Sequence, residues 1–199
     1  MGAVAEIVVG LRAGAYRLAA AGSRLEVLVA REGVLSPVGH DLFVDVRRFD
    51  ARIRVEEGRV DVEVGAEAAS VVPRCARRGE EELPGALSAG DRRDIERNLQ
   101  RDVLKAARWP RIVFRAQAPS RGASPRQILL PGTLELAGRS ARVLVELEQP
   151  EAGRPRFLLQ CRLRQSQFGI EPYRALLGAL RVQDEVRVRG TVELEPEPD

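Results

Sequence analysis

The amino-acid sequence predicts a mainly β protein, an antiparallel up-and-down β-barrel with one amphipathic helix and a short second helix. Most of the 199-residue chain consists of short stretches in which apolar and charged residues alternate, the pattern of strands with one buried face. These stretches follow one another through short turns, and a single long stretch has a helical period instead. A sheet of about eight to ten such strands must hide its apolar face, and closure into a barrel also removes the exposed edges.

The first third of the chain predicts a hairpin followed by a bent strand. Residues 16–18 and 25–31 flank a short turn and are expected to pair with each other. A turn-rich passage then leads into a strand at 42–46, whose apolar residues lie at even positions. In the next strand, at 49–55, the apolar residues lie at odd positions. This change of parity requires a bulge or kink near residues 47–48.

A further strand and a loop come next. In the strand, Val60, Val62 and Val64 alternate with charged residues. Residues 72–85 contain prolines, glycines and two runs of charged residues. That composition indicates a solvated loop.

The stretch with a helical period predicts a helix from about residue 90 to about residue 104. Ser88 and Asp91 supply side chains that can cap its first turn. Pro110 lacks the backbone donor that a helix needs, so the chain is expected to leave as a strand at 111–117. We expect the helix to lie over the open end or flank of the sheet. Its apolar face consists of Ile95, Leu99 and Val103.

The second half of the chain predicts a hairpin, a strand, a short helix and a last strand. A loop at 119–125 leads into the hairpin, whose strands lie at 129–136 and 141–148. Pro131 marks the first part of the hairpin as a sheet edge or a bulge. The remaining elements are a strand at 156–165, a short helix at 172–180 with Pro172 in its first turn, and a strand at 185–194.

Composition and charge narrow the range of partners. The net charge is only +3, because acidic and basic residues are interleaved, and 4% of the residues are aromatic. Both observations argue against nucleic acid as a partner. Glu6 and Arg12 interrupt the apolar N-terminal run, so we expect neither a signal peptide nor a membrane span, and hence a cytoplasmic location. In a reducing compartment, Cys75 and Cys161 are expected as free thiols.

Patterns that carry catalysis or bind metals are scarce. His40 is the only histidine, which excludes multi-histidine metal sites. His40 and Asp41 could form half of a catalytic dyad, but no glycine-flanked serine nucleophile accompanies them. We therefore expect a turn histidine without a catalytic role, no cofactor and no metal.

Four segments, in this order and spacing, resemble the YceI-like polyisoprenoid-binding family. The resemblance runs from about residue 16 to about residue 194, within a single domain expected to span residues 1–199. Two positions depart from the family pattern, since Ala137 replaces a histidine and Trp109 replaces a tyrosine, and the loop at 72–85 is longer than expected. The segments are the strand opening with GHD at 39–41, the helix and strand at 95–114, the hairpin GTLELAG at 132–138 and the FGI step at 168–170.

The resemblance implies a lipocalin-like barrel that holds a long isoprenoid, such as a polyprenyl tail or an isoprenoid quinone, for sequestration, storage or transport. A lumen lined by Val, Leu, Ile and Phe suits such an aliphatic guest. The expected wall contacts are Leu42, Phe49, Ile53, Phe114, Leu134, Val143, Cys161 and Val188. Ile95, Leu99, Trp109, Phe168, Tyr173 and Leu177 are expected to close the ends, and His40, Arg47 and Arg174 to lie near a head group or a mouth.

Two alternatives stay open on the sequence alone. In one, the same apolar residues fill the barrel, and an exposed edge or the helix binds a protein partner. In the other, the chain is a hydrolase-type enzyme that uses His40 and Asp41. The sequence does not fix the oligomeric state, and a homodimer is one option.

Overall fold

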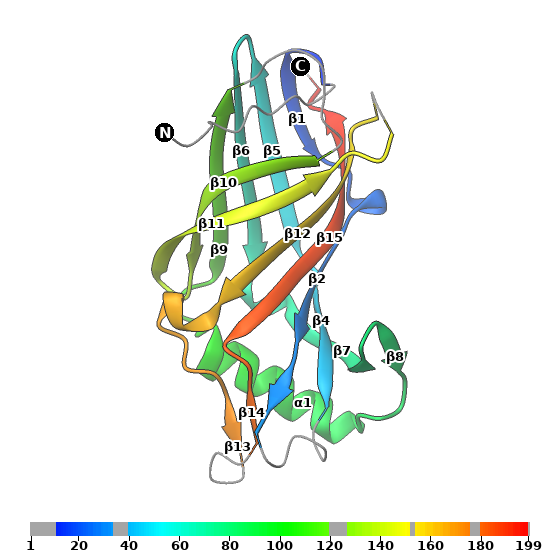
Figure 1. The fold of residues 1–199 in the computed structure, drawn as a ribbon, viewed down its shortest axis with the longest axis vertical. Coiled ribbons are helices and arrows are strands. Elements are labelled where there is room, and N and C mark those ends of the chain that lie inside the picture. Colours follow the sequence, from blue (N-terminus) through cyan, green and yellow to red (C-terminus); the bar gives the residue numbers. More distant parts are fainter. Residues whose placement is uncertain (1–10, 34–39, 120–126, 152–153, 176–179, 199) are drawn as a thin grey trace.

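Eight antiparallel strands form a closed barrel in this structure, a computed structural model that describes residues 11–33, 40–119, 127–151, 154–175 and 180–198. The barrel closes because the first and last strands of this set, β1 and β15, pair with each other (Figure 1). The predicted antiparallel barrel is therefore confirmed. Its strands, in spatial order, are β1 (Gly14–Leu18), β5 (Phe49–Glu56), β6 (Arg59–Glu67), β9 (Arg111–Pro119), β10 (Gln127–Leu136), β11 (Arg139–Glu148), β12 (Arg156–Arg164) and β15 (Glu185–Pro196).

A second group of strands extends the same sheet beyond β15. In spatial order it consists of β2, β4, β7 and β8, and it runs down from the barrel toward the helix (Figure 1). We call this group the wing. Its strands are β2 (Arg24–Val29), β4 (Asp41–Val46), β7 (Val71–Arg78) and β8 (Glu81–Leu83).

The predicted first hairpin is wrong, because β1 and β2 both pair with β15 at successive points. Glu195 of β15 pairs with Arg17 of β1, whereas Arg187 pairs with Leu28 of β2. A short 3-10 turn, Ala20–Gly22, separates the two strands without reversing the chain. The backbone stays on β15 across this turn, since the amide of Ala19 donates to the carbonyl of Glu193 at 2.8 Å.

Two similar interruptions of the extended chain lie where the wing strands β4 and β7 join the barrel strands β5 and β6. The predicted kink at residues 47–48 is present between β4 and β5. Between β6 and β7 the chain makes the 3-10 turn Ala68–Ser70. The buried hydroxyl of Ser70 joins the two breaks, because it accepts from the Arg48 amide at 3.0 Å and donates to the Glu67 carbonyl at 2.8 Å.

The solvated loop predicted at 72–85 is also wrong, since β7 and β8 form a hairpin there. Pro73 is buried and lies at a bulge, where Phe43 pairs with Cys75 but Val44 pairs with Pro73. A bulge is one of the few places where a strand accepts proline. The charged run is not simply solvated, because its carboxylates bind arginines of the neighbouring strands, as described below.

The helix α1 (Ala89–Asn98) continues as a π-helical turn, Leu99–Val103, so the helical stretch agrees with the prediction to within a residue at each end. Ser88 and Asp91 form a capping box, with each side chain accepting from the other residue's amide. Helix and turn pack against β7 at the lower end of the barrel (Figure 1).

The short second helix predicted at 172–180 is contradicted by two strands. β13 (Arg174–Ala175) and β14 (Leu180–Val182) pair with each other, and β14 also pairs with β3 (Arg31–Glu32). These backbone bonds to β3, distant in sequence, override the local helical period. Residues 176–179, between the two strands, lie outside the described part of the chain.

The hairpin of β10 and β11 is confirmed, with a turn at Ala137 and Gly138, both at positive φ. Pro131 lies in a part of β10 that has no partner on its β9 side, because β9 pairs with β10 only from Gly132 to Glu135. This agrees with the predicted sheet edge. The predicted loop at 119–125 falls almost entirely outside the described residues.

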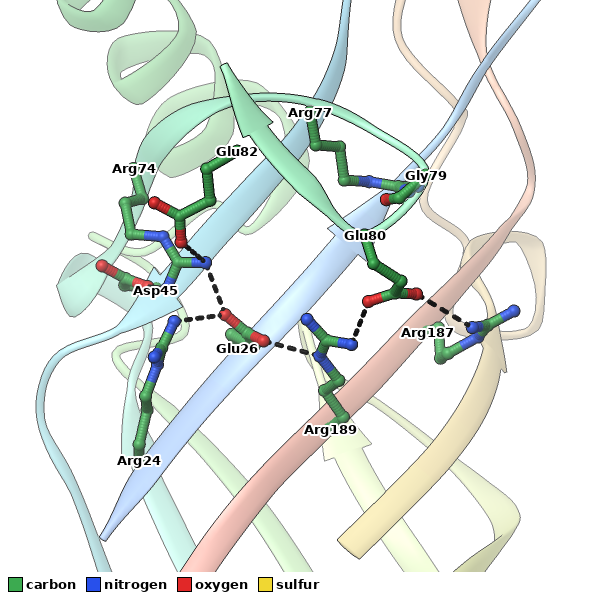
Figure 2. A network of polar contacts seen from close by, with 10 residues as sticks. All are labelled: Arg24, Glu26, Asp45, Arg74, Arg77, Gly79, Glu80, Glu82, Arg187 and Arg189. Atoms are coloured by element: carbon green, nitrogen blue, oxygen red, sulfur yellow. Dashed lines mark hydrogen bonds and ion pairs between the residues drawn. The ribbon is translucent and has the colours of Figure 1, made fainter. Parts of the chain in front are cut away.

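The outer face of the wing carries a dense network of ion pairs around Glu26 (Figure 2). The Glu26 side chain is only 7% exposed and binds Arg24 at 2.8 Å, Arg74 at 2.8 Å and Arg189 at 2.6 Å. Arg74 also binds Asp45 and Glu82, both at 3.0 Å.

The β7–β8 hairpin lies over the wing and reaches the barrel strand β15. Glu80, in the hairpin turn, binds Arg189 and Arg187 of β15. Beneath the hairpin, Phe43 is 1% exposed, and the guanidinium groups of Arg74 and Arg189 lie 4.8 and 5.5 Å from its ring centre. The network thus fixes the hairpin over an aromatic side chain on the outside of the sheet.

Replacement of Glu26 by alanine is expected to lower the free energy of unfolding by about 2 to 3 kcal/mol, because three arginines would lose a shared buried partner. Urea denaturation measures the loss. Glu63→Ala provides the matched control, since Glu63 binds Arg115 at 2.8 Å while 48% exposed. An exposed pair of this kind contributes at most about 1 kcal/mol. Equal losses in both variants would contradict a structural role for the network.

Candidate functional site

The lumen of the barrel contains an apolar cavity of about 290 Å³. Side chains from seven of the eight barrel strands line it, together with residues of the wing and of the π-helical turn. An apolar engineered cavity of about 150 Å³ stays dry and binds benzene, so a cavity of this size can hold an apolar guest. Representative lining residues are Val27, Val46, Val64, Leu130, Val145 and Leu159.

The cavity extends along most of the barrel. On β6 the lining residues run from Val60 to Ala66, six residue steps that span about 20 Å. At one end of the cavity lies Leu11, which packs against the cluster that contains Tyr16 and Val55. At the other end, next to the helix, lie Leu99, Val103 and Leu104. A volume of about 290 Å³ spread over such a length describes a narrow channel.

The lining is almost free of polar groups. No charged side chain occurs among the described residues that line the cavity, and Gln165 and the thiol of Cys161 are the polar groups. Strand parity explains this composition, because the charged residues of each barrel strand point outward, as in the exposed Arg52 and Arg54 that flank the buried Ile53 on β5. The cavity therefore suits an uncharged guest.

Phe114 narrows the middle of the channel and depends on a glycine to do so. Gly132 lies on the inward parity of β10, and a Cβ atom there would lie 2.3 Å from Cε2 of Phe114. The Phe114 ring thus occupies the space that a side chain at Gly132 would fill. A glycine in the wall shapes the lumen at this point.

Eight of the residues predicted to contact a ligand line this cavity. They come from six different strands and the π-helical turn, and the seven on strands lie on the inward parity that the alternating pattern indicates. The eight are Phe49, Ile53, Leu99, Phe114, Leu134, Val143, Cys161 and Val188.

Leu42, Ile95 and Phe168 do not line the cavity. Leu42 packs instead against the cluster that contains Val44 and Leu104. Phe168 is 1% exposed and belongs to the cluster around Leu163, so its role is packing. Ile95 is partly buried on α1.

Trp109 and Tyr173 lie at the surface, and Leu177 lies outside the described residues. Trp109 is 36% exposed and covers the β10–β11 turn, where a Cβ on Gly138 would lie 2.3 Å from its ring. Tyr173 is 46% exposed. The sequence pattern placed these aromatic residues at the ends of the barrel, but neither lines the cavity.

The polar residues predicted at a mouth are exposed and apart from the cavity lining. This holds for His40, Arg47 and Arg174. Asp41 is engaged elsewhere, because its carboxylate accepts from the Arg31 amide at 3.0 Å and lies 3.8 Å from Arg77. Within the described part of the chain, no group of three or more His, Cys, Asp or Glu side chains could hold a metal ion.

Several lining residues were missed by the sequence reasoning although the signal was present. Val44, Val60, Val62 and Leu130 share the inward parity of residues that were predicted. Gln165 also continues the inward parity of the strand predicted at 156–165, although β12 itself ends at Arg164. It was left out of the predicted contacts because only apolar residues were chosen for the wall.

Burial raises the pKa of the Cys161 thiol to about 11, and nearby Glu146 adds to this shift. The thiol therefore stays protonated near neutral pH. Burial also raises the pKa of Cys75, which lies on the outer face of the wing beneath the β7–β8 hairpin. Both cysteines are free thiols, as predicted.

Two solved structures match the chain over nearly their whole length. BcnA from Burkholderia cenocepacia has a TM-score of 0.62 at 13% identity, covering 89% of this chain and 99% of its own. A polyisoprenoid binding domain from Saccharophagus degradans, implicated in plant cell wall breakdown, has a TM-score of 0.60 at 12% identity, covering 92% of this chain and 98% of its own. This chain shares the barrel fold of these two proteins.

The resemblance predicted from the sequence is thus confirmed at the level of the fold. A Campylobacter jejuni YCEI protein also matches, with 15% identity and a TM-score of 0.49 over 78% of this chain and 85% of its own. No family model and no curated protein sequence matches the chain. Among the described helices, none is long and apolar enough to cross a membrane.

The two thiols of this barrel are expected to react slowly in the native state and rapidly after denaturation. At pH 8 a thiol with a pKa of about 11 is about one part in a thousand thiolate, the reactive form. Titration with a thiol reagent should therefore find two groups only when denaturant is added.

The single variants Cys75→Ser and Cys161→Ser assign the two reactions. Rapid native labelling of the Cys75→Ser variant, in which Cys161 alone remains, would show that the lumen is open to solvent at this depth. Absence of two titratable thiols after denaturation would contradict the free state of the cysteines.

Proposed function

We propose that the chain binds a long-chain isoprenoid, of the polyprenyl or isoprenoid quinone type, in the lumen for sequestration, storage or transport. The observation that supports this most is the long, narrow, apolar cavity that runs along the barrel axis. The eight predicted residues that line it are the proposed contacts, and the other predicted ligand contacts among the described residues do not line the cavity.

The shape of the cavity favours a chain over a compact ligand. Lining residues extend over about 20 Å along β6, whereas the volume is that of a small ligand site. An extended hydrocarbon of small cross-section fills such a space along its whole length. A folded or polycyclic guest of the same volume would leave one end of the channel empty.

The chemistry of the lining favours hydrocarbon as well. Burial of apolar surface contributes roughly 25 cal/mol per Å² and needs no directional partner. A charged or strongly polar guest would lose its hydration without finding a partner, because the described lining contains no charged side chain. One of the matched structures is described as a polyisoprenoid binding domain, in agreement with this class of guest.

We propose binding rather than catalysis, since His40 is exposed and Asp41 is engaged in ion pairs with arginines. A barrel filled by its own side chains agrees poorly with a cavity of about 290 Å³. The cytoplasmic location and the option of a homodimer remain predictions from the sequence.

Leu134→Trp is expected to fill the lumen with its own side chain and to abolish ligand binding. Leu134 lies on the inward face of β10, is 9% exposed and lines the cavity. A guest at a hundredfold over its Kd stabilises the folded state by about 2.7 kcal/mol, so a polyprenol should raise the melting temperature of the natural protein. The plugged variant should fold but show no such rise.

Leu129→Trp is the matched control, because Leu129 lies on the outer face of the same strand and is 50% exposed. It should keep the full response to the polyprenol. An equal response in all three proteins would mean that the ligand binds outside the lumen. No response in the natural protein, combined with no lipid in native mass spectra of protein from its own host, would overturn the proposed function.

His40→Ala is expected to change the melting temperature and the polyprenol affinity only slightly, because the side chain is exposed and lies apart from the cavity lining. Thermal denaturation with and without polyprenol tests this. Loss of a hydrolytic or transferase activity in the folded variant would establish an enzyme in place of a binding protein.

A further inference from the structure

Gln165 is the one amide or carboxylate side chain among the described residues that line the cavity. We infer that its Oε1 atom accepts a hydrogen bond from a hydroxyl of the guest, so that the barrel selects a neutral isoprenoid alcohol. This inference rests on the proposed function and specifies its ligand. It concerns the end of the channel near the helix.

The position of Gln165 is fixed by its surroundings. It begins the 3-10 turn Gln165–Phe168, directly after β12. Its amide N–H donates to the carbonyl of Asp184 at 2.9 Å, and its carbonyl accepts from the amide of Ile170 at 3.1 Å. Leu163, Ile170 and Val186 line the cavity around it and belong to the same packed cluster as Val103 of the π-helical turn.

The orientation of the Gln165 side chain follows from hydrogen-bond chemistry. Its Nε2 atom donates to the backbone carbonyl of Gln183 at 2.8 Å. A carbonyl can only accept, so the amide nitrogen and not the oxygen must face Gln183. Oε1 is left as an acceptor with no partner among the described residues, and it is not sealed within the protein.

An unpaired acceptor on a side chain that lines an apolar cavity would distinguish between neutral head groups. A hydroxyl donates to Oε1 when the guest displaces water. An ether or an ester offers only acceptors, so it buries Oε1 without a partner, which is costly. A diphosphate is disfavoured at this depth, because no charged side chain lines the described cavity to receive it.

The test compares a C20 all-trans polyprenol with its methyl ether, using the full-length protein and one fluorescent lipid displaced by either compound. The natural protein should bind the alcohol about tenfold more tightly than the ether. This comparison requires no variant, so it does not depend on the folding of a mutant. Equal affinities of alcohol and ether would overturn the inference and leave the proposed function intact.

Gln165→Leu should bring the alcohol-to-ether ratio close to one while retaining affinity for the ether. Gln167→Leu is the matched control, because Gln167 lies in the same turn, is exposed and does not line the cavity, and it should keep the ratio. A ratio unchanged in Gln165→Leu would assign the selectivity to another group and overturn the inference. Failure of both compounds to bind the natural protein would instead overturn the proposed function itself.

Discussion

The last strand determines the architecture because two different strands pair with the same edge of it. On one side, β15 pairs with β12 from Glu185 to Glu193. On the other side it pairs first with β2 and then with β1. The pairing with β1 closes the barrel, and the pairing with β2 opens the wing. Gly190 permits the close approach of β2, since a Cβ there would lie 2.3 Å from the Arg24 carbonyl oxygen.

This division separates the apolar and polar halves of the structure. On the inner side, the wing strands β2 and β4 contribute apolar side chains such as Val27 and Val44 to the same cavity, so the apolar surface extends toward the helix. Outside, the wing gains a second layer, because the β7–β8 hairpin is held over Phe43 by Glu80 and Glu82. A buried ion-pair network is weak evidence for stability in itself, but it fixes one arrangement of the strands.

Alternation in the sequence was sufficient for the barrel, the helix and most of the lumen, because each depends on local period. Parity alone placed Leu134 and Val143 on the inward face, whereas the expectation of an open lumen there came from the family resemblance. The first hairpin and the second helix could not be predicted correctly, since β2 and β14 take partners that are distant in sequence. The residues 72–85 were misread because their charges find partners on β4 and β15, which no local pattern reveals. Trp109 was predicted to close an end of the barrel because it is a large aromatic residue next to the helix. Its side chain covers the β10–β11 turn instead of the cavity.

The cavity also has an energetic consequence that links stability to ligand binding. At about 24 cal/mol per Å³, an empty space of about 290 Å³ corresponds to about 7 kcal/mol of packing that a filled core would have gained. Such a deficit is comparable to the whole stability of many domains. The packed clusters and the closed ladder of strands must therefore offset it when the lumen is empty. A hydrocarbon guest would restore part of the missing packing contacts. Binding such a guest would therefore raise the free energy of unfolding of this barrel.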